Sequence, residues 1–176
     1  MKPSTLHNIK LLTTLTIMSL LSNTANAAVE DGVYDIPQYK DLRTHKTLSS
    51  LECLAVNAYH EARSEGRIAN IMVMGVVLNR VSDTRRFPNG ICDVVFKAKA
   101  FSWVGDKYSD EIKNIPQYKR LYRIAEYVLS NKELVSQMTE GADHYHSAKI
   151  SPWWNTAKGF KKIARVDNHL FYSSEW

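Results

Sequence analysis

The sequence has 176 residues, with 23 lysine and arginine residues, 18 aspartate and glutamate residues and a formal net charge of +5. This length fits one compact domain. The basic residues are mixed with acidic ones and form no basic stripe, so the composition argues against a nucleic-acid partner.

Residues 1–27 have the features of a secretory signal peptide. Two lysines supply the positive start, residues 11–21 form a short apolar stretch, and residues 25–27 (ANA) are a typical cleavage site. The stretch is shorter than the about 20 apolar residues that span a bilayer. We therefore expect cleavage before Ala28 and no stable membrane insertion, although an uncleaved anchor is the alternative. Without these two lysines the mature chain has 21 basic and 18 acidic residues, a net charge of +3.

Residues 28–47 are polar and without periodicity, which predicts a partly disordered N-terminal arm before a catalytic domain at residues 48–176. Cys53 and Cys92 are predicted to form a disulfide, because an exported chain meets an oxidising compartment. Two buried free thiols are the alternative. The signal peptide and the cysteine pair both favour the periplasm or secretion to the cell wall.

The domain is predicted to begin with two helices. Residues 48–64 have apolar residues at helical spacing, and Thr47, Ser49 or Ser50 can cap the start of this helix. Residues 68–81 are apolar on nearly every face, which is typical of a central core helix.

The rest of the chain is predicted to change from helix to sheet. Residues 91–96 form a short apolar piece, and residues 116–131 carry an apolar stripe at helical spacing. Residues 142–147 alternate in the residue types that face the two sides of a strand, which is typical of β structure. Residues 161–166 and 169–172 predict a hairpin. The predicted fold class is α+β, with a mainly helical core and a small C-terminal antiparallel sheet.

The densest group of ionisable side chains lies at residues 59–65 (YHEARSE). Glu61 borders the apolar face of its helix, so burial is expected to raise its pKa, and the charge of Glu65 would raise it further. A carboxylic acid that stays protonated near neutral pH can donate a proton to a glycosidic oxygen. On residue types alone, a solvated helix end with the glutamates paired to Arg63 and Arg67 is slightly favoured over a catalytic acid.

Seven short motifs follow one another between residues 51 and 172. They are HEARSE (60–65), VVLNRV (76–81), FP (87–88), ICDVV (91–95), FSW (101–103), GA leading into HYH (141–146), and NHLFY (168–172). In this order and spacing they resemble the cell wall hydrolases typified by the spore-cortex lytic enzymes, the SleB/CwlJ-like family. The resemblance implies a fold like that of lysozyme and the lytic transglycosylases, with peptidoglycan as the substrate. It also implies that the catalytic residue is the first glutamate of E-A-R-x-E, here Glu61.

Most glycosidases need two carboxyl groups, whereas a lytic transglycosylase needs one. The aspartates of this chain are scattered, and Glu65 is expected on the same wall of a groove as Glu61. This favours transglycosylation, in which Glu61 acts first as the acid and then as the base. A muramidase that uses water is the alternative.

Aromatic and polar residues on loops and strand ends are candidates for substrate binding, because rings can stack on sugar faces. The predicted substrate-binding residues are Glu65, Asn79, Phe101, Ser102, Trp103, Tyr145, His146 and Tyr172. Asn79 could orient Glu61 or an N-acetyl group, or could instead be a helix C-cap. Core packing is the alternative for the aromatic residues.

Other functions are alternatives for the same sequence. His60, His144, His146 and His169 could form the zinc site of a peptidase with Glu61 as the base, but residue 64 is serine and the H-E-x-x-H motif is absent. A wall-binding domain without activity is another. We expect no metal or other cofactor, a monomer, and peptidoglycan as the partner. A helix-turn-helix DNA reader is disfavoured by the export signal and the apolar second helix.

Overall fold

The computed structural model describes residues 36–38, 42 and 44–175. The predicted signal peptide and most of the predicted arm therefore lie outside the described residues. Within the arm, Leu42 is buried in the core, and the ring of His45 stacks on Phe96 with centroids 4.6 Å apart. Packed contacts thus begin before residue 48, the start of the domain expected from the sequence.

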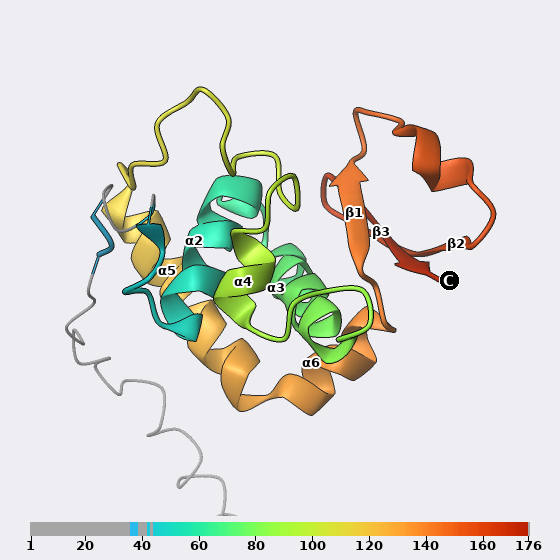
Figure 1. Ribbon diagram of the computed structural model, residues 1–176, viewed down its shortest axis with the longest axis horizontal. Helices are drawn as coiled ribbons and strands as arrows, with labels where there is room; N and C mark the ends of the chain where they lie inside the picture. Colours follow the sequence, from blue (N-terminus) through green and yellow to red (C-terminus); the bar gives the residue numbers. More distant parts are fainter. Residues whose placement is uncertain (1–35, 39–41, 43, 176) are drawn as a thin grey trace, which may run out of the picture. The chain divides into compact units, whose positions relative to one another are not determined.

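The described residues form a mainly helical domain with a small sheet (Figure 1). The helices are α2 (Ser50–Ala62), α3 (Arg67–Ser82), α4 (Ile91–Val95), α5 (Ile115–Ser130), α6 (Lys132–Thr139) and the 3-10 helix η1 (Trp153–Thr156). The strands are β1 (His144–Ser147), β2 (Phe160–Val166) and β3 (His169–Ser174). The predicted fold class is confirmed. Helix α6 and the 3-10 helix η1 are additions, since the sequence indicated only a segment that ends at Gly141 and a loop around Trp153.

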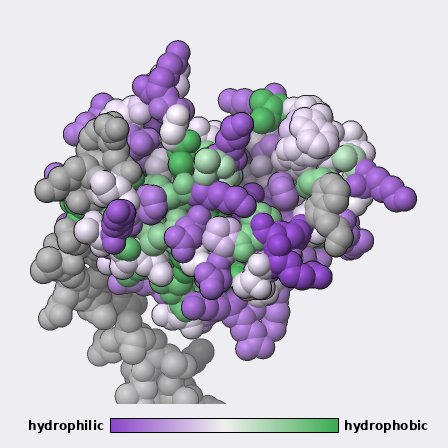
Figure 2. Space-filling view, viewed as in Figure 1, coloured by the Kyte–Doolittle hydropathy of each residue, from purple (hydrophilic) through white to green (hydrophobic). Residues whose placement is uncertain are grey.

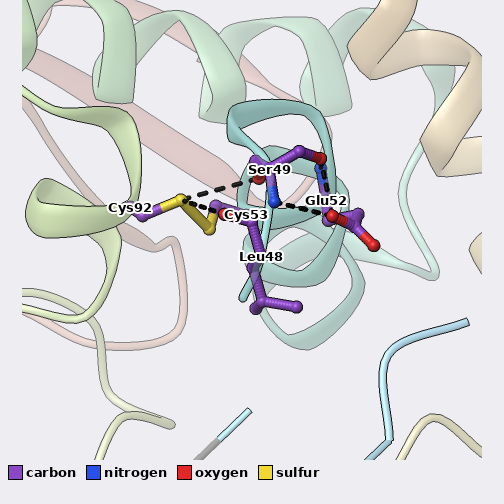
Figure 3. The surroundings of a disulfide bond; sticks show 5 residues. All are labelled: Leu48, Ser49, Glu52, Cys53 and Cys92. Carbon is purple, nitrogen blue, oxygen red and sulfur yellow. Dashed lines mark hydrogen bonds between the residues drawn. A yellow bond between two sulfur atoms is a disulfide. The ribbon is translucent and has the colours of Figure 1, made fainter. Parts of the chain in front are cut away.

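Helix α2 is fixed at its first turn by a capping box (Figure 3). The backbone N–H of Glu52 donates to Oγ of Ser49 at 3.2 Å, and the backbone N–H of Ser49 donates to Oε2 of Glu52 at 2.6 Å. Ser49 is therefore the N-cap among the three predicted candidates. One turn later the predicted disulfide is confirmed, because Cys53 is bonded to Cys92 of α4. These contacts anchor the helix that carries Glu61 near its end.

Helix α3 is the central core element that its sequence predicts. Its buried residues face both sides of the domain: Met74 and Val77 belong to the main helical core, whereas Met72, Val73 and Val76 pack with Phe171 of β3. The helix therefore joins the helical core to the sheet by apolar packing.

The sheet is antiparallel with the order β1-β3-β2. The turn between β2 and β3 is attached to the turn between α2 and α3 by hydrogen bonds. The N–H of Gly66 donates to Oδ2 of Asp167 at 2.8 Å, and Nδ2 of Asn168 donates to Oε1 of Glu65 at 3.1 Å. Because Glu65 follows the end of α2, this attachment places the sheet beside the C-terminal end of that helix.

Candidate active site

A groove of about 430 Å³ lies where the end of α2 meets the sheet. We call it the Glu61 groove. It is lined by His60, Glu61, Arg80, Ala100, Phe101, Ser102, Tyr145, His146, Ser147, Ile150, Pro152, Trp154 and His169. In the space-filling view, the surface is hollowed between the helices and the sheet (Figure 2). A hollow of about 580 Å³ near Asp83 is larger, but its Arg86 is paired with acidic side chains. We therefore identify the Glu61 groove as the candidate site by its side chains and not by its volume.

Side chains from two other segments of the chain donate hydrogen bonds to the carboxyl group of Glu61. Oγ of Ser102, in the loop after α4, donates to Oε1 at 3.3 Å, and the hydroxyl of Tyr145, on β1, donates to Oε2 at 3.1 Å. Burial and the neighbouring carboxylate raise the pKa of Tyr145 well above its ordinary value. The tyrosine therefore stays protonated and acts as a donor to Glu61.

The environment of Glu61 favours its protonated form. Burial raises the pKa of Glu61, and this effect exceeds the opposing effects of the hydrogen bonds from Tyr145 and Ser102 and of the charge of Arg80. Burial is the cause predicted from helical spacing. Repulsion from Glu65, the second predicted cause, is not among the causes of the shift.

The paired helix end favoured on residue types alone is wrong. The guanidinium of Arg63 lies over the ring of Tyr59, 5.2 Å from its centroid, and Arg67 lies over Tyr127 at the same distance. Among the described side chains, neither arginine forms an ion pair with a glutamate. Glu61 therefore faces the groove without a salt bridge.

Arg80 is a groove residue that sequence reasoning missed. It is only 7% exposed. Its Nε donates to the carbonyl oxygen of Asp143 at 2.7 Å, its Nη1 donates to that of Ala100 at 3.4 Å, and its guanidinium lies over Phe101. These hydrogen bonds to carbonyl oxygens hold the positively charged guanidinium group of Arg80 near Glu61. A charged residue near the end of a mostly apolar helix was the available signal.

Two histidines in the groove are kept neutral by burial. Burial lowers the pKa of His60 to about 4 and also lowers the pKa of His169. The ring of His60 stacks on Trp103 with centroids 4.4 Å apart. Nε2 of His60 and Nδ1 of His169 are buried without a hydrogen-bond partner in the described part of the chain. The sequence suggested these residues only as zinc ligands.

The zinc-peptidase alternative gains no support from the geometry. Within residues 36–38, 42 and 44–175, no three histidine, cysteine, aspartate or glutamate side chains lie close enough together to hold a metal ion. His146, one of the suggested ligands, directs its Nε2 to the hydroxyl of Tyr172 at 3.2 Å and its Nδ1 to the carbonyl oxygen of Ser147 at 2.9 Å.

Four of the predicted substrate-binding residues line the Glu61 groove and four do not. Those in the groove are Phe101, Ser102, Tyr145 and His146. Among the others, Glu65 accepts hydrogen bonds from Asn168, and Tyr172 contacts His146.

The remaining two predicted residues also bond to structural partners. Nε1 of Trp103 donates to Oδ1 of Asn57 at 3.0 Å. Nδ2 of Asn79 donates to the carbonyl oxygen of Ala142 at 2.8 Å and to the hydroxyl of Thr139 at 3.0 Å. Both side chains therefore connect elements of the fold, which the residue types alone could not distinguish from substrate binding.

Comparisons with known proteins identify the fold and the family of the chain. The chain is similar to the catalytic domain of the Bacillus cereus SleB protein, with a TM-score of 0.53 and 24% sequence identity over 70% of this chain and 89% of that chain. Residues 64–172 match the Cell Wall Hydrolase family, and the chain therefore belongs to this family, as its motifs predicted. Its substrate is peptidoglycan, and its place of action is the cell wall, outside the cytoplasm. A comparison with curated protein sequences found no match.

The family match begins at Ser64, three residues after Glu61. The choice of Glu61 as the reacting group therefore depends on the groove and on the E-A-R-x-E motif.

None of the described helices is long and apolar enough to cross a membrane.

Proposed function

We propose that this chain is a lytic transglycosylase that cleaves the glycan strand of peptidoglycan, with Glu61 as its single acid and base. One observation carries the proposal: among the described residues that line the groove, Glu61 is the only one with a carboxyl group. A two-carboxylate hydrolase needs a second carboxyl group across the sugar, roughly 5–10 Å away. Glu65, the nearest glutamate in the sequence, instead accepts hydrogen bonds from Asn168.

The proposed reaction has two proton transfers. In the first, the protonated carboxyl group of Glu61 gives its proton to the glycosidic oxygen, and the bond from that oxygen to the anomeric carbon breaks. In the second, the 6-hydroxyl oxygen of the same sugar bonds to the anomeric carbon, and the Glu61 carboxylate takes the hydroxyl proton. The products are a shortened strand and a 1,6-anhydro end, and no water is consumed.

The groups around Glu61 are suited to both steps. Burial favours the protonated acid before the first transfer, as the raised pKa of Glu61 indicates. The donors Tyr145 and Ser102, with the charge of Arg80, stabilise the carboxylate formed by that transfer. This balance supports one residue in two successive roles.

Mass analysis of the products of purified peptidoglycan tests the proposal. We expect anhydro-muropeptides, which are lighter by one water molecule than the products of hydrolysis. Reducing ends would identify a muramidase that uses water, and free peptides would identify a peptidase. Binding to peptidoglycan without any product would identify a wall-binding domain. Each of these three outcomes would overturn the proposal.

Export is part of the proposal. Residues 1–27 act as a signal peptide, and the mature chain is a monomer with an arm at residues 28–47 and a catalytic domain at residues 48–176. The disulfide between Cys53 and Cys92 supports an oxidising compartment. Intact-mass measurement of the protein recovered from the periplasm or the medium should give a chain that starts at Ala28. A full-length chain there would contradict cleavage.

A further inference from the structure

A second hollow, of about 400 Å³, adjoins the Glu61 groove. The two share Arg80, Ala100, Tyr145 and Trp154 as lining residues, so they are adjacent hollows that contact the same side chains. We call the second hollow the lysine pocket, because Lys97 and Lys99 line it on the side that the groove does not share.

The lysine pocket is positively charged. Lys97, Lys99 and Arg80 line it, and no acidic side chain does so among the described residues. Within the same residues, neither lysine forms an ion pair. The hollow near Asp83 differs, because its Arg86 is paired with Asp83 and Asp143. The charge of the lysine pocket is therefore available to an anionic ligand.

The pocket also offers apolar surface beside its charges. Nζ of Lys97 lies 6.0 Å from the ring centroid of Phe87, and Trp154 and Val94 are further lining residues. A ligand with both carboxylates and aliphatic carbon would therefore find a partner for each part.

The backbone at Lys99 adds a second, independent observation. Its φ is +63°, in the left-handed region that residues with a side chain seldom adopt. Residues held in such conformations cluster at functional sites. The next residue, Ala100, lines both hollows and accepts a hydrogen bond from Arg80. The unusual conformation thus occurs where the lysine pocket meets the groove.

We propose that the lysine pocket binds the carboxylates of the stem peptide that branches from the glycan strand. This rests on the proposed function, because a strand seated in the Glu61 groove would bring its peptide branch to the adjoining hollow. Stem peptides carry free carboxylates on short aliphatic residues, which match the ammonium groups and the apolar wall. The enzyme then prefers strands that bear peptides over strands that have lost them.

Kinetics on two substrates tests the proposal. Strands with intact stem peptides are compared with strands from which an amidase has removed the peptides. The variant is Lys97→Gln combined with Lys99→Asn, since asparagine tolerates a positive φ. The control is Lys113→Gln combined with Lys132→Gln. Both lysines are exposed and line neither hollow, and their replacement removes the same charge as the pocket variant does.

We expect the pocket variant to lose about tenfold in kcat/KM on peptide-bearing strands, mainly through KM, and to keep its rate on stripped strands. The control should match the wild type on both substrates. Equal loss on both substrates, no loss on either, or an equal loss in the control would overturn the proposal.

Peptide binding separates failure of this proposal from failure of the proposed function. A free acidic stem tetrapeptide and the same peptide with amidated carboxylates are titrated calorimetrically against the wild type and the pocket variant. Only the acidic peptide should bind, and only to the wild type, with an affinity that falls as salt rises. Equal binding of both peptides, equal binding to both proteins, or no binding would overturn the proposal that the lysine pocket binds stem peptides. This conclusion would hold whatever products the enzyme forms from glycan.

Discussion

The hydroxyl group of Tyr145 donates a hydrogen bond of 3.1 Å to Oε2 of Glu61, across 84 positions of the sequence. Tyr145 belongs to β1 and Glu61 to α2, so this bond joins the sheet to the helical core at the proposed reacting group. It also opposes the effect of burial on the pKa of Glu61. The packing of the sheet beside α2 therefore helps to set the pKa of Glu61.

Tyr145→Phe should move the alkaline limb of the pH profile of kcat/KM to higher pH. The lost hydrogen bond stabilised the carboxylate form, so the pKa of Glu61 rises further and the acid stays protonated at higher pH. Ser102→Ala should move the limb in the same direction, because Ser102 also donates to this carboxyl group. A limb that stays in place, or moves to lower pH, would contradict the role of Tyr145.

Glu61→Gln should reduce the rate of strand cleavage by about 10²- to 10⁴-fold, the range typical of a lost general acid and base. Glutamine keeps the size and polarity of the side chain, so the melting temperature should change little. Glu126→Gln is the matched control, since Glu126 is exposed on α5 and lines neither hollow. Retained activity in Glu61→Gln would refute the proposed function.

Glu65→Gln should lower the stability of the fold and leave kcat unchanged. Its carboxylate accepts hydrogen bonds from the backbone and side chain of Asn168, which attach the β2–β3 turn to the end of α2. We expect a loss of about 1 kcal/mol, or about 3 °C in melting temperature. The pH profile should keep its shape. A large fall in kcat with an unchanged melting temperature would instead indicate a direct catalytic role.

Replacement of both cysteines by alanine should lower the free energy of unfolding by about 3–4 kcal/mol, the loop-entropy value for a bridge of this span. Cys53 and Cys92 are 39 positions apart and connect α2 to α4. Urea unfolding with and without a reductant measures the effect. The reductant should destabilise the wild type and leave the double alanine variant unchanged. Equal stability of the oxidised and reduced wild type would show that the bridge does not stabilise the fold.

His60 should make stability fall as the pH drops from about 6.5 to 4. Its pKa is 6.5 when unfolded and about 4 in the fold, so between these values the unfolded chain binds more protons. The contribution of His60 to the free energy of unfolding is present above pH 6.5 and lost at acid pH. After allowance for partial exposure, this loss is about 2 kcal/mol. In His60→Phe, the dependence of unfolding free energy on pH should flatten over this range. An unchanged slope would exclude His60 as its source.

Short-range patterns in the sequence predicted most of the fold. Helical spacing predicted α2, α3 and α5 to within two residues at each end, and alternation with turn residues predicted the β2–β3 hairpin. These predictions succeed because periodicity and capping act between residues close in the chain. Helix α6 was missed, because the eight residues from Lys132 to Thr139 have only two buried positions, too few for a clear stripe.

The sequence by itself also determined the family, the candidate glutamate and the disulfide pair, since these follow from residue types and their order. Only the tertiary structure decided the surroundings of Glu61. Trp103 and Phe101 look equivalent in sequence, yet Trp103 bonds to Asn57 and Phe101 lines the groove. Arg80 and Tyr145 meet Glu61 because α3 and the sheet pack against α2. Burial, hydrogen-bond partners and proton affinity arise from such long-range packing, so no local pattern could have predicted them.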